Sequence, residues 1–227
     1  MVYRAAVRGA DSRAVLSRLG VVLKRTHSYS SLKLWRTCPA QYRAKYMDGI
    51  KSAPGPALVK GKEYHERLEA AVGTGAVPAG MWTPDGLIPA LHRAGARPEQ
   101  QYGMYEDGTP CSFDDPKAWL RGAIDVELRS DSRAILLDWK TGQYRVDPFQ
   151  ADVYATLLRA HYTKDLTVCF NFVYVDAKRT CKVRPDHQAE ARVRARATAC
   201  ENDEVHAPRP CWACRFCPVT SCIYNGD

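Results

Sequence analysis

Residues 122–142 read GAIDVELRSDSRAILLDWKTG, and this stretch decides the fold. It holds two short runs rich in Ile, Val and Leu, Gly122–Leu128 and Ala134–Lys140. The polar segment between them contains Asp131-Ser132, which suits a hairpin turn. We therefore expect two neighbouring strands that form a hairpin.

The polar residues of these strands are placed by strand geometry. Side chains alternate between the two faces of a strand, so Asp138 and Lys140 point the same way and Trp139 points the opposite way. Pairing with the preceding strand would bring Asp125 beside them. Two carboxylates and a main-chain carbonyl form a hard, oxygen-rich site that suits Mg²⁺ or Mn²⁺. The alternative is that Asp138 and Lys140 are an ordinary exposed pair on an edge strand.

The rest of the chain alternates between helical and strand periodicity. We expect helices over residues 28–47, 58–73, 87–93, 150–161 and 185–205, with a break in the first at Pro39. We expect a loop over 51–57, irregular structure over most of 74–98, a strand over 166–175, and 181–184 pairing with it. Strands followed by helices, with a helical layer in front, predict an α/β domain with a mixed sheet.

Composition limits the class of protein. The 227 residues contain 33 Lys and Arg against 25 acids, a net charge of +8 that favours an anionic partner such as nucleic acid. No apolar run approaches the roughly 20 residues that cross a bilayer, so we expect no membrane association. Residues 1–27 form a basic extension that is Arg-rich and poor in acids like a transit peptide, but we expect an ordered helix or hairpin.

Further polar residues follow the order of a known pattern. His65 lies on the helix expected over 58–73, and Gln150 and Tyr154 share one face of the helix that follows Asp138-Trp-Lys140. Each residue alone is typical of an ordinary helix surface. Together they resemble the PD-(D/E)XK nuclease superfamily, specifically its RecB-like exonuclease branch, from about Ser28 to Cys222. The motifs that carry the resemblance are Ser28-Tyr-Ser-Ser-Leu, Cys38-Pro39, Tyr42, Gly61…His65, Gly122-Ala-Ile-Asp125, Asp138-Trp-Lys140-Thr-Gly and Gln150…Tyr154.

The resemblance implies a restriction-endonuclease-like core and a role for each site residue. Asp125, Asp138 and the Trp139 carbonyl would bind the catalytic Mg²⁺ or Mn²⁺, and His65 would join that metal or a second one. Lys140 would act on the attacking water. Gln150 and Tyr154 would support the site or contact the substrate. The family's motif often has proline where Ile124 precedes Asp125, a departure that the superfamily tolerates. Glu99, on a possible earlier strand, is a further candidate carboxylate.

Four cysteines are clustered near the end of the chain. Cys211, Cys214, Cys217 and Cys222 lie within twelve positions, a density that indicates a metal or cluster site. By ligand count, four thiolates serve zinc or an iron–sulfur cluster equally well. The sequence is similar to an iron–sulfur subset of the RecB-like branch, which includes the AddB nuclease domain and CRISPR-associated nucleases. That resemblance implies a [4Fe–4S] cluster on Cys38, Cys214, Cys217 and Cys222, with Cys211 as the alternative to Cys38.

These features predict one nuclease domain over residues 28–222, with a cysteine-rich tail, 206–227, that packs on the first helix. The expected activity is metal-dependent exonuclease or end-processing cleavage of DNA, at single strands or duplex ends, in repair, recombination or phage DNA metabolism. A cytoplasmic setting, in a bacterium or a phage-infected host, would suit it. A helicase or recombination partner would supply unwinding, since a Walker motif is absent. The alternative function is a non-catalytic nucleic-acid-binding module that holds zinc or a cluster.

The expected contacts with DNA are less specific. Basic residues cluster on the first helix and near the last one, and they suit phosphate contacts: Lys33, Arg36, Arg43, Lys45, Arg184, Arg192, Arg194 and Arg196. Aromatic residues suit base stacking, although helical periodicity favours burial in the core: Trp35, Tyr42, Tyr46, Trp212 and Phe216. Restriction-like endonuclease activity is disfavoured, because this length leaves no room for a separate recognition domain.

Overall fold

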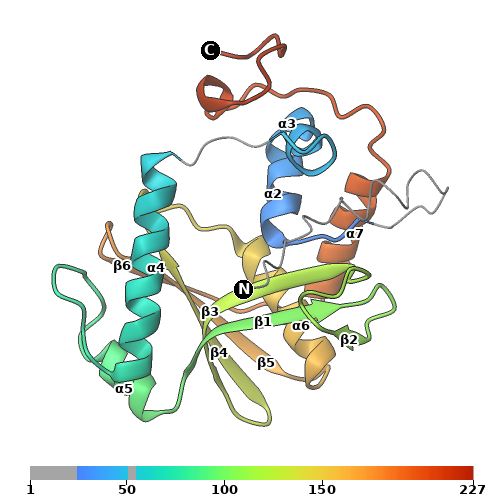
Figure 1. Cartoon of the computed structure of the whole chain (residues 1–227). Coiled ribbons are helices and arrows are strands. Elements are labelled where there is room, and N and C mark those ends of the chain that lie inside the picture. Colours follow the sequence, from blue (N-terminus) through green and yellow to red (C-terminus); the bar gives the residue numbers. More distant parts are fainter. Residues whose placement is uncertain (1–24, 51–54, 227) are drawn as a thin grey trace, which may run out of the picture.

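The computed structural model describes residues 25–50 and 55–226, and its centre is a mixed sheet (Figure 1). The strand order is β2-β1-β3-β4-β5-β6; β4 and β5 pair in parallel and the other neighbours pair antiparallel. The strands are β1 (Arg97–Met104), β2 (Pro110–Cys111), β3 (Leu120–Arg129), β4 (Arg133–Lys140), β5 (Thr167–Tyr174) and β6 (Arg179–Val183). The predicted α/β fold with a restriction-endonuclease-like mixed sheet is confirmed.

Helices cover both faces of this sheet. They are α2 (Tyr29–Thr37), α3 (Pro39–Tyr46), α4 (Pro56–Thr74), α5 (Leu87–Arg93), α6 (Pro148–His161), α7 (Ala189–Glu201) and the short 3₁₀ helix η1 (Cys214–Phe216). Apolar residues of α2, α6 and α7 form one core with Leu136 and Phe170 of the sheet. Residues of α4 and α5 form the other core with Leu137 and Trp139. None of the described helices is long and apolar enough to span a bilayer.

The first two helices meet where the sequence predicts a break. Ser28 caps α2 in a reciprocal capping box with Ser31, which satisfies free N–H groups of the first turn. Cys38 between the helices is extended, with φ −154° and ψ 105°, because Pro39 disfavours helical geometry in the residue before it. The Cys38 side chain is buried at this junction.

Several boundaries differ from the expectation. Strand β1 begins at Arg97, within a region expected to be irregular. The sequence did not predict this start, because the first residues of the strand are polar and show no strand periodicity. Helix α4 begins at Pro56, inside the predicted loop, since proline suits the first helical position. Helix α7 begins at Ala189 rather than 185.

The prediction of a helix or hairpin before residue 25 falls outside the described residues. The described end of that segment is integrated into the domain. His27 is fully buried, bridges to Leu120 in parallel, and hydrogen-bonds Glu201 of α7 through Nε2 at 2.7 Å. Burial lowers the pKa of His27, although Glu201 opposes that shift. The segment after residue 24 therefore connects β3 to α7.

The close contact of β3 with α6 yields a prediction. A Cβ atom on Gly122 would lie 2.7 Å from Tyr154 and 3.0 Å from Leu157. Gly122→Ala should therefore cost about 1–3 kcal/mol in free energy of unfolding, through overpacking. The exposed helical Gly73 has no atom within 4 Å of such a Cβ. Gly73→Ala should instead stabilise by about 0.5–1 kcal/mol. Urea unfolding measures both, and equal effects would contradict the close packing.

Candidate active site

The site forms where β3 and β4 separate. Their paired residues run from Val126↔Leu137 to Arg129↔Ala134. At the open end, the side chain of Asp125 replaces a ladder bond: its Oδ2 accepts a hydrogen bond from the Trp139 backbone N at 2.8 Å. This bond fixes Asp125 beside Asp138, which is the arrangement that the sequence predicts for neighbouring strands.

A break in side-chain alternation accompanies this separation. Ile124 belongs to the core with α6, whereas Val126, two residues later, belongs to the core with α4. In a regular strand these two residues would share a face. Across β1, Pro98 pairs with Val126 and Gln100 with Ile124, so Glu99 lies opposite Asp125, and its φ is +49°. The left-handed conformation is unfavourable for glutamate, and such strain is typical of functional sites.

Asp138 is the buried carboxylate of the site, with 4% of the residue exposed. Gln150 Nε2 of α6 donates a hydrogen bond to its Oδ1, and Lys140 Nζ lies 2.6 Å from its Oδ2. Burial raises the pKa of Asp138 to about 6; Lys140 opposes this shift and the negative charge of Asp125 adds to it. Two carboxylates held together in this way favour a bound cation.

Helix α4 contributes His65 from the opposite side of the sheet. Its Nδ1 lies 3.3 Å from Asp125 Oδ2. Burial alone would lower the pKa of His65, but the hydrogen bond and charge of Asp125 raise it above its ordinary value. The pocket here is lined by Lys62, His65, Glu66, Glu69, Glu99, Asp125 and Trp139. Glu99, the further candidate carboxylate, is thus in the same pocket as Asp125.

Gln150 and Tyr154 lie on the buried face of α6. Gln150 is 3% exposed and Tyr154 is 8% exposed, and the Tyr154 ring stacks on Phe170. Burial raises the pKa of Tyr154. In this position Gln150 orients Asp138, and Tyr154 packs between α6 and the sheet.

A basic groove opens on the Lys140 side of the site. Its polar and aromatic lining includes Tyr29, Lys33, Lys45, Lys140, Arg145, Gln150, Trp212 and Arg215. Burial lowers the pKa of Lys33, an effect that Asp147 opposes. Of the aromatic residues expected to stack bases or to pack, Tyr42 is buried, and Tyr46 and Trp212 are exposed. The groove leads from the tail to Lys140.

Asp147 and Tyr29 are site residues with no role predicted from the sequence, although Tyr29 lies in the Ser28-Tyr-Ser-Ser-Leu motif. Asp147 caps α6 by accepting from the Phe149 backbone N at 3.2 Å. Its other oxygen accepts from the Tyr29 hydroxyl of α2 at 3.1 Å. The Asp-Pro pair before a helical run is a recognisable start signal for α6. The contact with Tyr29, 118 residues away, has no signal in the sequence.

The oxygens of Asp125 and Asp138 suit a hard divalent cation by their chemistry, although these side chains do not surround one metal position. Among the described residues, no three His, Cys, Asp or Glu side chains are arranged to hold a metal ion. Their oxygens instead meet protein donors: Trp139 N–H at Asp125, and Gln150 and Lys140 at Asp138. Asp138 is buried and Asp125 is half-buried. Their carboxylate oxygens are of the kind that Mg²⁺ and Mn²⁺ prefer as ligands.

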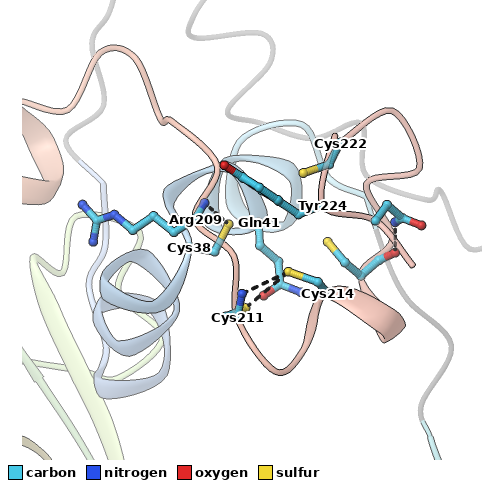
Figure 2. Close-up of a pocket in the computed structure, with 9 residues that line it drawn as sticks. Cys38, Gln41, Arg209, Cys211, Cys214, Cys222 and Tyr224 are labelled. Atoms are coloured by element: carbon cyan, nitrogen blue, oxygen red, sulfur yellow. Dashed lines mark hydrogen bonds between the residues drawn. The ribbon is translucent and has the colours of Figure 1, made fainter. Parts of the chain in front are cut away.

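The cysteines gather at a second place, between α3 and the tail (Figure 2). Cys38, Cys211, Cys214, Cys217 and Cys222 line one pocket, together with Gln41, Arg209, Tyr224 and Asn225. The sulfur atoms of Cys211 and Cys214 are 3.8 Å apart. Two backbone N–H groups point at sulfur: Arg209 N at Cys38, 3.5 Å, and Cys211 N at Cys214, 3.2 Å. Such donors stabilise thiolates. Thiolates are ligands for zinc and for iron–sulfur clusters, but among the described residues no three of these cysteines are arranged around one metal position.

Comparison with known proteins identifies the class. The model of the PD-(D/E)XK nuclease superfamily matches residues 26–222, so the chain belongs to this superfamily. Membership implies a nuclease, a hydrolase that acts on DNA, and members typically use divalent metals such as Mg²⁺.

Solved structures agree at the level of the fold. The structure described as "Crystal structure of SSO0001" is similar with a TM-score of 0.52 and 17% sequence identity, over 96% of this chain and 98% of that one. At this identity the similarity concerns the fold alone. No curated protein gives a significant match.

The buried Asp138 yields a prediction for stability. Its raised pKa means that ionisation costs the folded state more than the unfolded one, so stability without divalent metal falls as pH rises through about 6. Asp138→Asn removes this cost, and the variant should gain up to about 3 kcal/mol over the wild type at pH 8 and little at pH 4. Urea unfolding at both pH values measures it, with the exposed Asp165→Asn as control. A gain independent of pH would contradict the mechanism.

Proposed function

We propose that the chain is a divalent-metal-dependent DNA exonuclease or end-processing nuclease of the RecB-like branch, acting on single strands or duplex ends. The observation that carries the proposal is the meeting of Asp125, Asp138, Lys140 and His65 from β3, β4 and α4 at the open end of the strand pair. The exonuclease assignment rests on the order of the motifs, from Gly61…His65 to Gln150…Tyr154.

Each residue has a role in hydrolysis of the phosphodiester. Asp125 and Asp138, with the Trp139 carbonyl, would hold Mg²⁺ or Mn²⁺, and His65 would complete this site or a second one. A metal bound there would supply charge stabilisation for the phosphate as the water oxygen bonds to phosphorus and the P–O bond breaks. Lys140 Nζ faces the groove and would orient the attacking water. Gln150 keeps the Asp138 carboxylate turned toward this point.

We propose further that the cysteine pocket holds a [4Fe–4S] cluster. Cys38, Cys214, Cys217 and Cys222 would be the ligands, with Cys211 as the alternative to Cys38 and Zn²⁺ as the alternative metal. The cluster would join α3 to the tail that carries Trp212 and Arg215 into the basic groove. Its loss would therefore loosen the groove and leave the carboxylates in place.

The biological setting follows from this activity. Repair, recombination or phage DNA metabolism, in the cytoplasm of a bacterium or an infected host, would need such a nuclease. A helicase or recombination partner would present the strand end.

The catalytic proposal predicts a separation of binding from cleavage. Asp138→Ala and Lys140→Ala should each lower the rate of Mg²⁺- or Mn²⁺-dependent cleavage of labelled single-stranded DNA by about a thousandfold or more. Binding without divalent metal should stay within a few fold. The exposed Lys164→Ala is the matched control for Lys140→Ala and should cleave like the wild type. If the wild type cleaves no DNA form with either metal, the non-catalytic binding module is the better assignment.

The cluster proposal is tested by metal content. Protein purified without oxygen should be brown, absorb visible light and contain about four iron atoms and four sulfides per chain. Cys214→Ser should lose the iron, whereas Cys200→Ser, at a buried cysteine outside the pocket, should keep it. Loss of iron in Cys38→Ser but not in Cys211→Ser would assign the fourth ligand to Cys38. A colourless protein that contains one zinc ion per chain would instead assign zinc to this pocket.

A further inference from the structure

A second groove lies beside the active-site groove, on the other side of α2. It is formed by α2, the start of α6, α7 and the segment after β6, and its charged lining comprises Arg36, Arg184, Arg192, Arg196, Arg209, Asp147, Asp152 and Asp186. These residues come from five separate parts of the chain, so their proximity is a product of the fold. The arginines outnumber the aspartates in this lining.

The acidic residues of the groove are already engaged. Arg192 forms ion pairs with both Asp152, at 2.7 Å, and Asp186, at 2.9 Å. Asp147 caps α6 and accepts from Tyr29. In the part of the chain that the structure describes, no carboxylate forms an ion pair with the other four arginines: Arg36, Arg184, Arg196 and Arg209. Among the described residues, these four guanidinium groups therefore have no carboxylate within ion-pair distance, although Asp147 and Asp152 act on Arg196 from farther away.

Contacts with the protein hold Arg209 and Arg196 in the groove. Arg209 Nη1 donates to the Arg36 carbonyl at 3.0 Å, and Arg196 lies 3.4 Å over the Phe149 ring. Burial lowers the pKa of Arg196 and the positive charge of Arg36 lowers it further, while Asp147 and Asp152 oppose this shift. Like charges brought together in this way are unfavourable unless an anion joins them. Arginine is well suited to phosphate, because its planar donors bind two oxygens at once.

The two grooves meet at Asp147. Asp147 lines both, and α2 forms the wall between them, with Lys33 and Thr37 on the active-site side and Trp35 and Arg36 on the other. A polyanion that passes Lys140 would reach the arginine groove at Asp147, whose carboxylate is held by the Tyr29 hydroxyl and the Phe149 backbone N. A flexible single strand can follow such a bend, whereas a duplex is stiff over this length.

We propose that this arginine groove binds the phosphates of a single DNA strand that extends beyond the active site. The inference rests on the proposed nuclease function and adds the path of the strand outside the site of cleavage. Arg36, Arg184, Arg196 and Arg209 are the phosphate-binding residues. The groove contributes affinity for long strands and takes no part in cleavage.

The test compares strands of two lengths. The double variant Arg36→Glu/Arg184→Glu reverses the charge of two exposed residues of the groove, so that both repel phosphate. Binding of an oligothymidylate of about 30 nucleotides, followed by fluorescence anisotropy without divalent metal, should weaken at least about tenfold, and the slope of log K against log salt should fall by about 1.4. Binding of one of about 5 nucleotides should change less than twofold. Lys117→Glu/Lys164→Glu, equal in charge and exposed outside the groove, is the control.

The outcomes distinguish this proposal from the nuclease assignment. Binding is measured without divalent metal and therefore without cleavage. A wild-type protein that never cleaves DNA would contradict the nuclease assignment and would still allow the arginine groove to be tested. Equal weakening in the control pair, or unchanged binding of the long strand, would overturn the groove. Thermal unfolding checks that both variants fold. If the charge reversals destabilise, Arg36→Gln/Arg184→Gln should show the same length dependence at about half the change in log affinity, and no length dependence would again overturn the proposal.

Discussion

The site depends on one constraint: two carboxylates that repel each other are held where β3 and β4 separate. Asp138 is buried and Asp125 accepts from the backbone of the neighbouring strand, so neither can turn away into water. The fold offsets this repulsion with donors from three directions, Gln150 of α6, Lys140 of β4 and His65 of α4. Helices on both faces are therefore needed to complete a site that the sheet begins.

The charges around this point are arranged asymmetrically. His65, Glu66, Glu69 and Glu99 share the pocket on one side, and lysines and arginines line the groove on the other. This separation gives a cation and a phosphate different approaches to the same carboxylates. The positive φ of Glu99, opposite Asp125, belongs to the same local distortion of the strands.

The proposed cluster would support the groove rather than the carboxylates. Cys38 lies at the break between α2 and α3, and the other four thiols of the pocket come from the last part of the chain. A bond between these positions would close nearly the whole chain into a loop, and closure of a long loop removes much entropy from the unfolded state. The same tail carries Arg209, which contacts Arg36. Under both proposals, a metal in the cysteine pocket and the path of the DNA strand would be linked through this segment.

The sequence by itself determined the elements whose signals are local. Asp138 and Lys140 share a face because strand periodicity is fixed, the break at Cys38-Pro39 follows from proline geometry, and the mixed α/β fold follows from the order of periodic segments. Strand β1 was expected only as a possible strand around Glu99, because its first residues are polar. Only the tertiary structure decided that Tyr29 contacts Asp147, that Gln150 is buried against Asp138, and that five arginines line one groove with three aspartates. These contacts join residues far apart in the chain, and burial, distance and charge between such residues arise from packing that no local pattern encodes.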